Sequence, residues 1–455
     1  MMRIPDSRSL AVPRQHDHRR LRVPEPAKSV VRSTGENTHH GVMAFSFIAM
    51  LMLSRAVMQL IQDPTLEHLD LEPDLRLQIA WVFLYGAVLL AILPRLPDFV
   101  MSLSRSPHIP LIVIASVASV MWSSAPDLTL RRSLALVGGT LVGGYLGYRL
   151  ELRDLLRVLS AIGLTVALSS LVSALAFPRF GVMPAGRGLA GAWRGVFPHK
   201  NALGLFMALA LIVFGLRLLE HRRLFSTHTI GLALSSFLIW KAQAVTSWVV
   251  TVALLVSAVF LYWIQRGSRD RHLAAFCGVG VATLVVYWVM SRSGLLLGAI
   301  EREETFYGRV ELWSGVLDVI RDAPLLGHGY GALWYDGGPS REILRGLDWT
   351  TNNAHNGFLE LALALGSPAV VIFLVGFFGS FASSLKVIGR TTTPVALWPL
   401  LYLVFFLIAN MTESVLLQQN DLFWALYVAT VISKSKLTVA TKPGSRPPVR
   451  RVTRA

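Results

Sequence analysis

The stretch "ALGLFMALALIVFGLRLL" (residues 202–219) is apolar throughout, apart from one arginine near its end. A helix rises about 1.5 Å per residue, so a segment of this length nearly crosses the roughly 30 Å hydrocarbon core of a bilayer. Eleven further apolar stretches of comparable character lie at 42–61, 77–93, 109–122, 133–148, 155–177, 229–245, 246–265, 272–291, 367–385, 395–411 and 419–433. The sequence therefore predicts an all-α polytopic integral membrane protein with about twelve transmembrane helices.

The composition of the whole chain agrees with this prediction. The 455 residues are 53% hydrophobic and only 15% charged, and the mean hydropathy is +0.53. Soluble globular domains carry about 25% charged residues, so a soluble protein of this length could not cover so much apolar surface. These numbers exclude the soluble classes.

The positive charges lie mainly on one side of the predicted bundle. Of the 43 Lys and Arg residues, 28 lie in the two ends of the chain and in alternate short loops. By the positive-inside rule this side is cytoplasmic, which places both termini there and predicts a multi-pass protein. The net charge of +16 is thus explained without nucleic acid, which is not an expected partner.

The chain divides into a membrane domain (42–433) and two basic tails (1–41 and 434–455). The tails are expected to be disordered in the cytoplasm and attracted to anionic membrane lipids. The first 40 residues lack the apolar core of a removable signal peptide, so the first span should remain as an anchor. Cys277 is the only cysteine and no Cys/His cluster has metal-ligand spacing, so neither a metal nor a cofactor is expected.

Two loops on the opposite, outer side are rich in functional residue types. One covers 178–201, and the larger covers 292–354. Residues 307–327 of the larger loop suit an amphipathic helix, either lying on the bilayer or folded over a cavity. Its apolar positions are Val310, Leu312, Trp313, Val316, Leu317 and Ile320.

A glycine- and aromatic-rich segment, "GHGYGALWYDGG" (327–338), follows that helix. Its glycines would allow the backbone to approach a ligand closely, which makes Tyr330 and Trp334 candidates for substrate binding. The larger loop is interpreted as a lid over a substrate, because long ordered loops are commonly functional. The alternative is a cap that only stabilises the packing of the helices.

Two helix starts on the predicted outer face share a His and Asn pattern: "PHKN" (198–201) and "AHNG" (354–357). Asparagine caps helix N-termini, and the remaining free amides there attract phosphate. A single pair would indicate capping alone, but two pairs on one face favour an anion site. The candidate binding residues are His199, Lys200, Asn201 and Asn356.

Arginines on this face also indicate an anionic ligand, since guanidinium binds phosphate bidentately. Arg194 and Arg309 are the strongest candidates, and Arg187 is a third. For the other arginines of the large loop, Arg341 and Arg345 above all, snorkelling to lipid headgroups is the alternative.

His355 is the candidate proton carrier, because imidazole exchanges a proton near neutral pH; a structural hydrogen bond is the alternative. Glu304, Glu311 or Asp336 could orient its ring from the loop. Glu360 is expected not to, because it lies about 140° away around the helix.

At these residues the chain resembles the O-antigen ligase and polymerase family (Wzy type), and within it the exopolysaccharide polymerases of succinoglycan type. Five motifs in family order carry the resemblance: "MWSSAPDLTLRRSL" (121–134), "WRGVFPHKNALG" (193–204), "YGRVELW" (307–313), "GHGYGALW" (327–334) and "AHNGFLELALALG" (354–366). The resemblance covers roughly residues 115–430.

The resemblance implies a metal-independent glycosyltransferase that polymerises oligosaccharide units carried on undecaprenyl diphosphate. It also implies that the reaction takes place at the periplasmic face of the bacterial inner membrane. Arg194 and Arg309 would hold the diphosphate, and His355 would act at the acceptor hydroxyl, with direct displacement inverting the anomeric centre. Relatives often carry a Ser–Lys/Arg–Thr motif where this chain has Val245, and Lys241 is the candidate substitute. The lipid-linked oligosaccharide is the expected partner, together with a chain-length regulator and polysaccharide export proteins.

Three alternatives remain open from the sequence. An O-antigen ligase would use lipid A–core as acceptor, and a protein-glycosylating oligosaccharyltransferase would use a protein. A flippase or transporter of lipid-linked sugar should place ionisable residues deep inside its spans. Only Arg55 and Lys241 are candidates for such positions, so the concentration of charge at one face favours surface chemistry.

Overall fold

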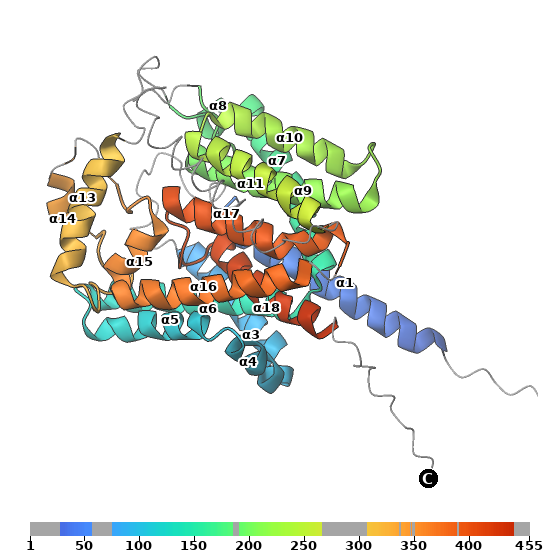
Figure 1. The fold of residues 1–455 in the computed structure, drawn as a ribbon, viewed down its shortest axis with the longest axis horizontal. Coiled ribbons are helices and arrows are strands. Elements are labelled where there is room, and N and C mark those ends of the chain that lie inside the picture. The colour runs from blue at the N-terminus through green and yellow to red at the C-terminus, as the bar shows by residue number, and fades with distance from the viewer. Residues whose placement is uncertain are drawn as a thin grey trace, which may run out of the picture. The chain divides into compact units, whose positions relative to one another are not determined.

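The computed structural model describes residues 28–56, 75–184, 191–265, 307–335, 338–345, 347, 351–388 and 391–440. These residues form helices joined by turns (Figure 1). The α-helices are α1 (Lys28–Leu53), α3 (Leu75–Ile92), α4 (Leu96–Ser104), α5 (His108–Ala118), α6 (Pro126–Arg149), α7 (Leu152–Ala176), α8 (Pro178–Gly181), α9 (Lys200–His221), α10 (Thr227–Ala242), α11 (Val245–Gln265), α13 (Tyr307–Asp322), α14 (Ser340–Arg345), α15 (Gly357–Leu365), α16 (Ser367–Ile388), α17 (Trp398–Thr412) and α18 (Leu422–Ala440). Three 3₁₀ helices are η1 (Leu93–Arg95), η2 (Ser119–Met121) and η3 (Pro394–Leu397).

Within the described ranges, six helical segments are long and apolar enough to cross a membrane. They are Leu75–Ser104, Leu152–Ala176, Lys200–His221, Val245–Gln265, Ser367–Ile388 and Pro394–Thr412. Shorter apolar helices lie at His39–Leu53, His108–Met121 and Leu422–Ser433. The prediction of an all-helical, multi-pass membrane protein is confirmed. The predicted span 272–291 lies outside the described residues, and each of the other predicted stretches falls on a described helix.

The chain separates into residues 1–42 and a much larger unit, residues 43–455. Helix α1 begins at Lys28, within the segment that the sequence predicts as a tail, and α18 continues to Ala440. Everything described below belongs to the larger unit.

The spans pack through small residues as well as through large apolar ones. In α6, Gly143 and Gly147 face the backbone of α18: a Cβ at Gly143 would lie 2.4 Å from the carbonyl oxygen of Ala425, and one at Gly147 would lie 2.6 Å from that of Ala429. Two glycines four residues apart let two helix backbones approach closely inside a membrane. A side chain at either position would force α6 and α18 apart.

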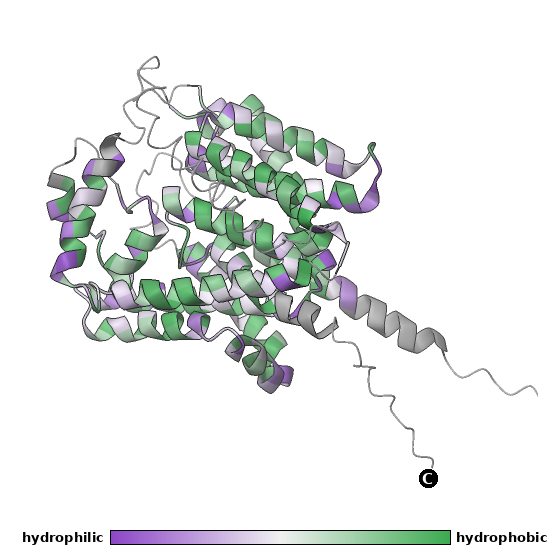
Figure 2. Cartoon of the chain, in the orientation of Figure 1, coloured by the Kyte–Doolittle hydropathy of each residue, from purple (hydrophilic) through white to green (hydrophobic). Residues whose placement is uncertain are grey.

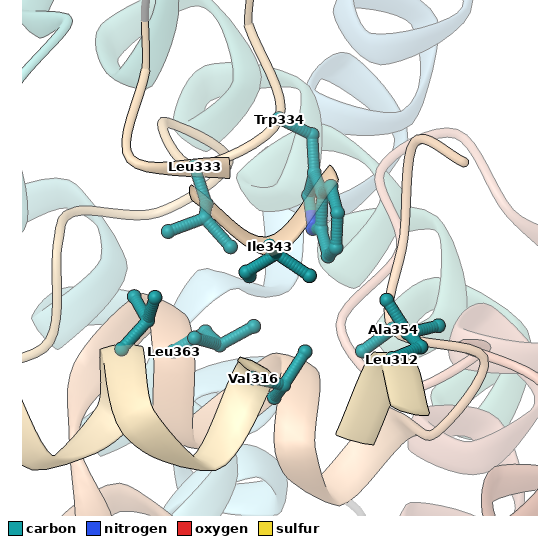
Figure 3. Packing of buried hydrophobic residues seen from close by; sticks show 8 residues of the cluster. Leu312, Val316, Leu333, Trp334, Ile343, Ala354 and Leu363 are labelled. Carbon is teal, nitrogen blue, oxygen red and sulfur yellow. The ribbon is translucent and has the colours of Figure 1, made fainter. Parts of the chain in front are cut away.

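Helices α13, α14 and α15 form a cap at one end of the bundle (Figure 1). The apolar face of α13 supplies Leu312 and Val316, which are fully buried against residues of the neighbouring loops and helices. Figure 3 shows these two side chains facing Leu333, Trp334, Ile343, Ala354 and Leu363. The predicted helix is therefore present, and the cap's own core covers Leu312 and Val316, whereas Leu317 of the predicted apolar face is exposed.

Helix α15 is a separate short helix and does not continue into the span that follows it. Gly366 ends it with φ +79°, and a Cβ there would lie 2.4 Å from the carbonyl oxygen of Leu325. The amide of Ser367 then bonds the carbonyl of Pro324 at 2.8 Å as α16 begins. This break keeps α15 in the cap, with its first residue beside the end of α17.

Candidate functional site

The site centres on His355, the residue just before the N-cap of α15. Its Nδ1 atom lies 3.2 Å from Oε2 of Glu413, which follows the last turn of α17. The two side chains are 21% and 16% exposed, so solvent reaches both while most of each is covered. A histidine paired with a carboxylate in a partly covered position is suited to proton transfer, because the carboxylate orients the ring and stabilises its charged form.

Glu413 also joins two other helices to this pair. Asn201, in the first turn of α9, donates from Nδ2 to Glu413 Oε1 at 2.8 Å. Arg309 of α13 places Nη2 3.3 Å from the same oxygen, and its Nη1 donates to the carbonyl of Thr412 at 2.6 Å. Four helices thus meet at one carboxylate, and three of the predicted site residues are brought together there.

The backbone before His355 is held by side chains of the cap. The amide of Ala354 donates to Oε2 of Glu360 at 2.9 Å, and its carbonyl accepts from Nε1 of Trp313 at 2.9 Å. The other oxygen of Glu360 accepts from Nε1 of Trp334 at 2.8 Å. Glu360 therefore fixes the peptide group next to the imidazole ring.

His355 itself has φ +46°, a conformation that few non-glycine residues adopt and that costs on the order of 1–3 kcal/mol. Its amide donates to Asn353 Oδ1 at 2.9 Å. Asn356 is the N-cap of α15: its side-chain oxygen accepts from the next two helical amides, and its own amide donates to Ser414 Oγ at 3.2 Å. The strained turn is thus fixed from both sides, which presents the imidazole to Glu413.

Replacing Glu360 with alanine is expected to lower both stability and activity. The variant removes the acceptor of two buried N–H groups, and each unsatisfied group costs about 1–3 kcal/mol. Without this acceptor the peptide group of Ala354 is no longer held in place. The rate of product formation, measured per milligram of folded protein, should therefore also fall by more than tenfold. Glu342→Ala, at an exposed position in α14, is the control. Unchanged melting and turnover in Glu360→Ala would contradict this role.

The charge states at the site follow from burial and from the neighbouring cations. Burial alone would raise the pKa of the Glu413 carboxyl, but the hydrogen bond with His355 and the charges of His355 and Arg309 hold that pKa at about 2. Burial lowers the pKa of His199 to about 4, against the opposing influence of Glu413. At neutral pH, Glu413 is therefore ionised and His199 is neutral.

Acidification is expected to destabilise the protein through both groups. Each has a lower pKa when folded than when unfolded, so each stabilises the fold above its unfolded pKa and loses this contribution as the pH falls. The windows run from 6.5 to about 4 for His199 and from 4.5 to about 2 for Glu413. Between pH 7 and pH 4, the free energy of unfolding should fall less for His199→Gln than for wild type, by on the order of 3 kcal/mol. Thermal melting at each pH measures this difference. Parallel curves for variant and wild type would contradict the assignment.

Arg194 forms its hydrogen bonds with a different part of the protein from the residues around Glu413. Its guanidinium is buried, and it donates from Nε to the carbonyl of Phe180 at 2.8 Å and from Nη2 to that of Arg179 at 3.1 Å. Among the described residues, none of its hydrogen bonds or ion pairs reaches Arg309, His355 or Glu413. Its visible contribution is to hold the loop that leads into α9.

The remaining candidates occupy several different environments. Tyr330 is buried, and its hydroxyl donates to the carbonyl of Leu417 in the loop between α17 and α18. Lys241 Nζ lies 5.2 Å from the ring centre of Trp193, and His199 is the N-cap of α9, accepting from the amide of Asn201. Lys200 is half-buried at the start of α9, and Arg187 lies outside the described residues.

Glu413 is the site residue that sequence reasoning missed. The loop carboxylates proposed instead were Glu304, Glu311 and Asp336, of which only Glu311 lies in the described part of the chain, and there it is exposed. One signal was available: "MTES" (411–414) places a carboxylate directly after a long apolar span, on the face that carries the arginines. Among the described residues, no group of three or more His, Cys, Asp or Glu residues is arranged to hold a metal ion.

Comparison with known proteins confirms the resemblance seen in the motifs. Residues 230–374 match the O-antigen ligase family model. The matched region contains Arg309 and His355 together with the cap, whereas Asn201 and Glu413 lie outside it.

A curated relative is the exopolysaccharide production protein ExoQ of Rhizobium meliloti (strain 1021). It is 25% identical over 286 residues, which cover 60% of this chain and 64% of the relative. The similarity therefore spans less than two thirds of that protein's length.

Proposed function

We propose that this chain polymerises oligosaccharide units, carried on undecaprenyl diphosphate, into an exopolysaccharide or O-antigen chain at the periplasmic face of the inner membrane. The similarity to the O-antigen ligase family and to an exopolysaccharide production protein supports the class of reaction. The observation that carries the proposal is the His355–Glu413 pair, with Arg309 on the same carboxylate.

In the proposed reaction His355 is the general base. Its Nδ1 faces Glu413, so proton transfer is assigned to Nε2, which takes the proton from the acceptor sugar hydroxyl. The hydroxyl oxygen forms the new bond to the anomeric carbon while the bond from that carbon to the diphosphate oxygen breaks. Undecaprenyl diphosphate leaves with the bonding electron pair, and ionised Glu413 stabilises the imidazolium that forms. General base catalysis of this kind contributes about 10²–10⁴-fold to the rate.

The diphosphate is proposed to lie near the starts of α9 and α15. Arg309, Lys200 and Lys241 supply positive charge there, and helix N-termini favour phosphate. Preorganised charge of this kind stabilises a leaving group as it departs. Arg194 is proposed to act through the loop that it holds, since its guanidinium is bonded to backbone carbonyls.

Direct displacement predicts inversion at the anomeric carbon. A purified lipid-linked unit of known configuration should give the opposite configuration at each new linkage, because the attacking oxygen enters opposite to the leaving diphosphate. NMR coupling constants of the product distinguish the two outcomes. Retention at the new linkage would reject a single displacement and require a covalent intermediate.

The proposed topology has twelve spans with both termini in the cytoplasm. Residues 42–433 form the membrane domain, the loop 292–354 lies in the periplasm, and residues 1–41 and 434–455 are basic tails. A chain-length regulator, export proteins and anionic lipids are the proposed partners. Cysteine accessibility scanning from each side of the membrane tests the topology directly.

The functional test supplies purified protein with a lipid-diphosphate oligosaccharide and separates the products by size. A ladder of products supports a polymerase. Transfer of one unit to added lipid A–core, with no ladder, would identify a ligase, the second candidate function, which the matched family's description favours. Transfer to an added protein would identify an oligosaccharyltransferase. Movement of the substrate across liposomes without new bonds would reject the enzyme assignment in favour of a flippase.

A further inference from the structure

A second polar cluster lies at the other end of the bundle from the His355 site. Asn201 begins α9 at that site, and Arg217 lies 16 residues further along the same helix, a rise of about 24 Å. Arg217 Nη1 bonds Glu220 Oε2 at 2.5 Å, and the other oxygen of Glu220 lies 2.9 Å from Nε of Arg153 in α7. Arg157, one turn further along α7, pairs with Asp154 at 2.7 Å.

The cluster has more cations than its carboxylates neutralise. Three guanidinium groups share the two carboxylates, and Arg217 is only 5% exposed. Its Nε atom is buried and has no hydrogen-bond partner among the residues that the structure describes. Arg153 and Arg157 have side chains that are 56% and 51% exposed, so they remain accessible from outside. Glu220 and Asp154 balance two of the three charges, so the cluster keeps one excess positive charge, which a further anion would balance.

The helices place this cluster at the level of the lipid headgroups. Arg153 is in the first turn of the apolar segment Leu152–Ala176, and Arg217 lies about one turn before the end of the apolar segment Lys200–His221. The ends of spans mark the boundary between hydrocarbon and headgroups, where phospholipid phosphates lie. The anion nearest to these arginines in a membrane is therefore a lipid phosphate.

The adjoining turn between α9 and α10 has the composition of a segment that touches a bilayer. Leu224 is 73% exposed and Phe225 is fully exposed, directly after Arg222 and Arg223. Figure 2 shows both hydrophilic and hydrophobic residues in this turn, which lies at the tip of two largely hydrophobic helices. Exposed apolar side chains beside arginines suit insertion among acyl chains with the charges at the phosphates, and a free anion would not use the apolar part.

We propose that the Arg153–Arg157–Arg217 cluster binds the phosphate of an anionic phospholipid, with Leu224 and Phe225 in contact with its acyl chains. The lipid ties α7 to the α9–α10 hairpin at the end of the bundle opposite to the reaction. This site is independent of the polymerase assignment, because neither its residues nor its ligand take part in the proposed reaction.

Native mass spectrometry of the detergent-purified full chain, titrated with phosphatidylglycerol or phosphatidylcholine, tests the proposal. Wild type should retain phosphatidylglycerol at about tenfold lower lipid concentration than the double variant Arg153→Gln/Arg157→Gln, since each arginine at an anionic headgroup contributes several-fold. The matched control is Arg131→Gln/Arg179→Gln, which removes two exposed arginines from α6 and α8. It should retain phosphatidylglycerol as wild type does.

Three results would overturn the proposal. Equal retention of phosphatidylcholine and phosphatidylglycerol would show that the headgroup charge is not recognised. Equal loss in the control variant would indicate general attraction to a basic protein. Full displacement of the lipid by millimolar inorganic phosphate would identify a small-anion site. Circular dichroism and gel-filtration elution of each variant, matched to wild type, separate loss of binding from loss of fold.

Discussion

Replacing His355 with alanine is expected to lower the formation of the product ladder by about 10²–10⁴-fold, because the acceptor hydroxyl loses its base. The side chain is on the surface of the cap's turn rather than in its core, being 21% exposed. The variant should therefore insert and fold normally. The φ of +46° is disfavoured for alanine as for histidine, so the backbone cost is nearly unchanged.

The measurement is the initial rate of ladder formation at saturating lipid-linked substrate, per amount of monodisperse protein. His40→Ala, at an exposed position in α1, is the matched control and should retain full activity. Raising the pH should restore part of the activity of His355→Ala, because a larger fraction of the acceptor hydroxyl is then deprotonated without the imidazole. A variant that elongates at the wild-type rate would remove His355 from the reaction.

Replacing Glu413 with glutamine is expected to have a comparable effect on the rate, and a larger effect on stability. The amide cannot stabilise the imidazolium, and in enzymes with a histidine–carboxylate pair this change costs up to about 10⁴-fold. It also removes the negative charge that faces Arg309. Removing one member of a buried ion pair costs about 3–5 kcal/mol, and the partial exposure of both side chains here places the loss toward the lower value.

A double-variant cycle separates the two consequences. If Glu413 acts through His355, the variant His355→Ala/Glu413→Gln should be no slower than the slower single variant, because residues that act as one unit are not additive. The melting temperature should still fall whenever Glu413 is changed. Multiplicative losses in the rate would show that Glu413 serves the reaction by a different route.

The parts of this protein that were predictable from sequence depend on local rules. A membrane span is specified by about twenty neighbouring apolar residues, and the α13 helix by a repeating apolar face. The Asn356 cap likewise depends on residues two and three positions away. For these features the printed sequence contains all of the relevant partners.

The site could be predicted only in part, because its key contact is not local. Glu413 is 58 residues from His355, and their contact depends on how the end of α17 packs beside α15. The partners of Arg194 are backbone carbonyl oxygens, which every residue possesses, so no sequence pattern distinguishes this arrangement from a ligand-binding one. Glu360 reaches the backbone of Ala354 only because the turn at His355 is left-handed.

The convergence of four helices on Glu413 has a consequence for synthesis of the protein. Asn201 and Glu413, which bond each other, are 212 residues apart, so the ribosome completes most of the membrane domain before the carboxylate emerges. A nascent chain that already exposes Arg309 and His355 lacks the group that orients them. Under the proposed function, transfer chemistry is expected to begin only after the final hairpin has been inserted, and prematurely terminated chains are expected to be inactive.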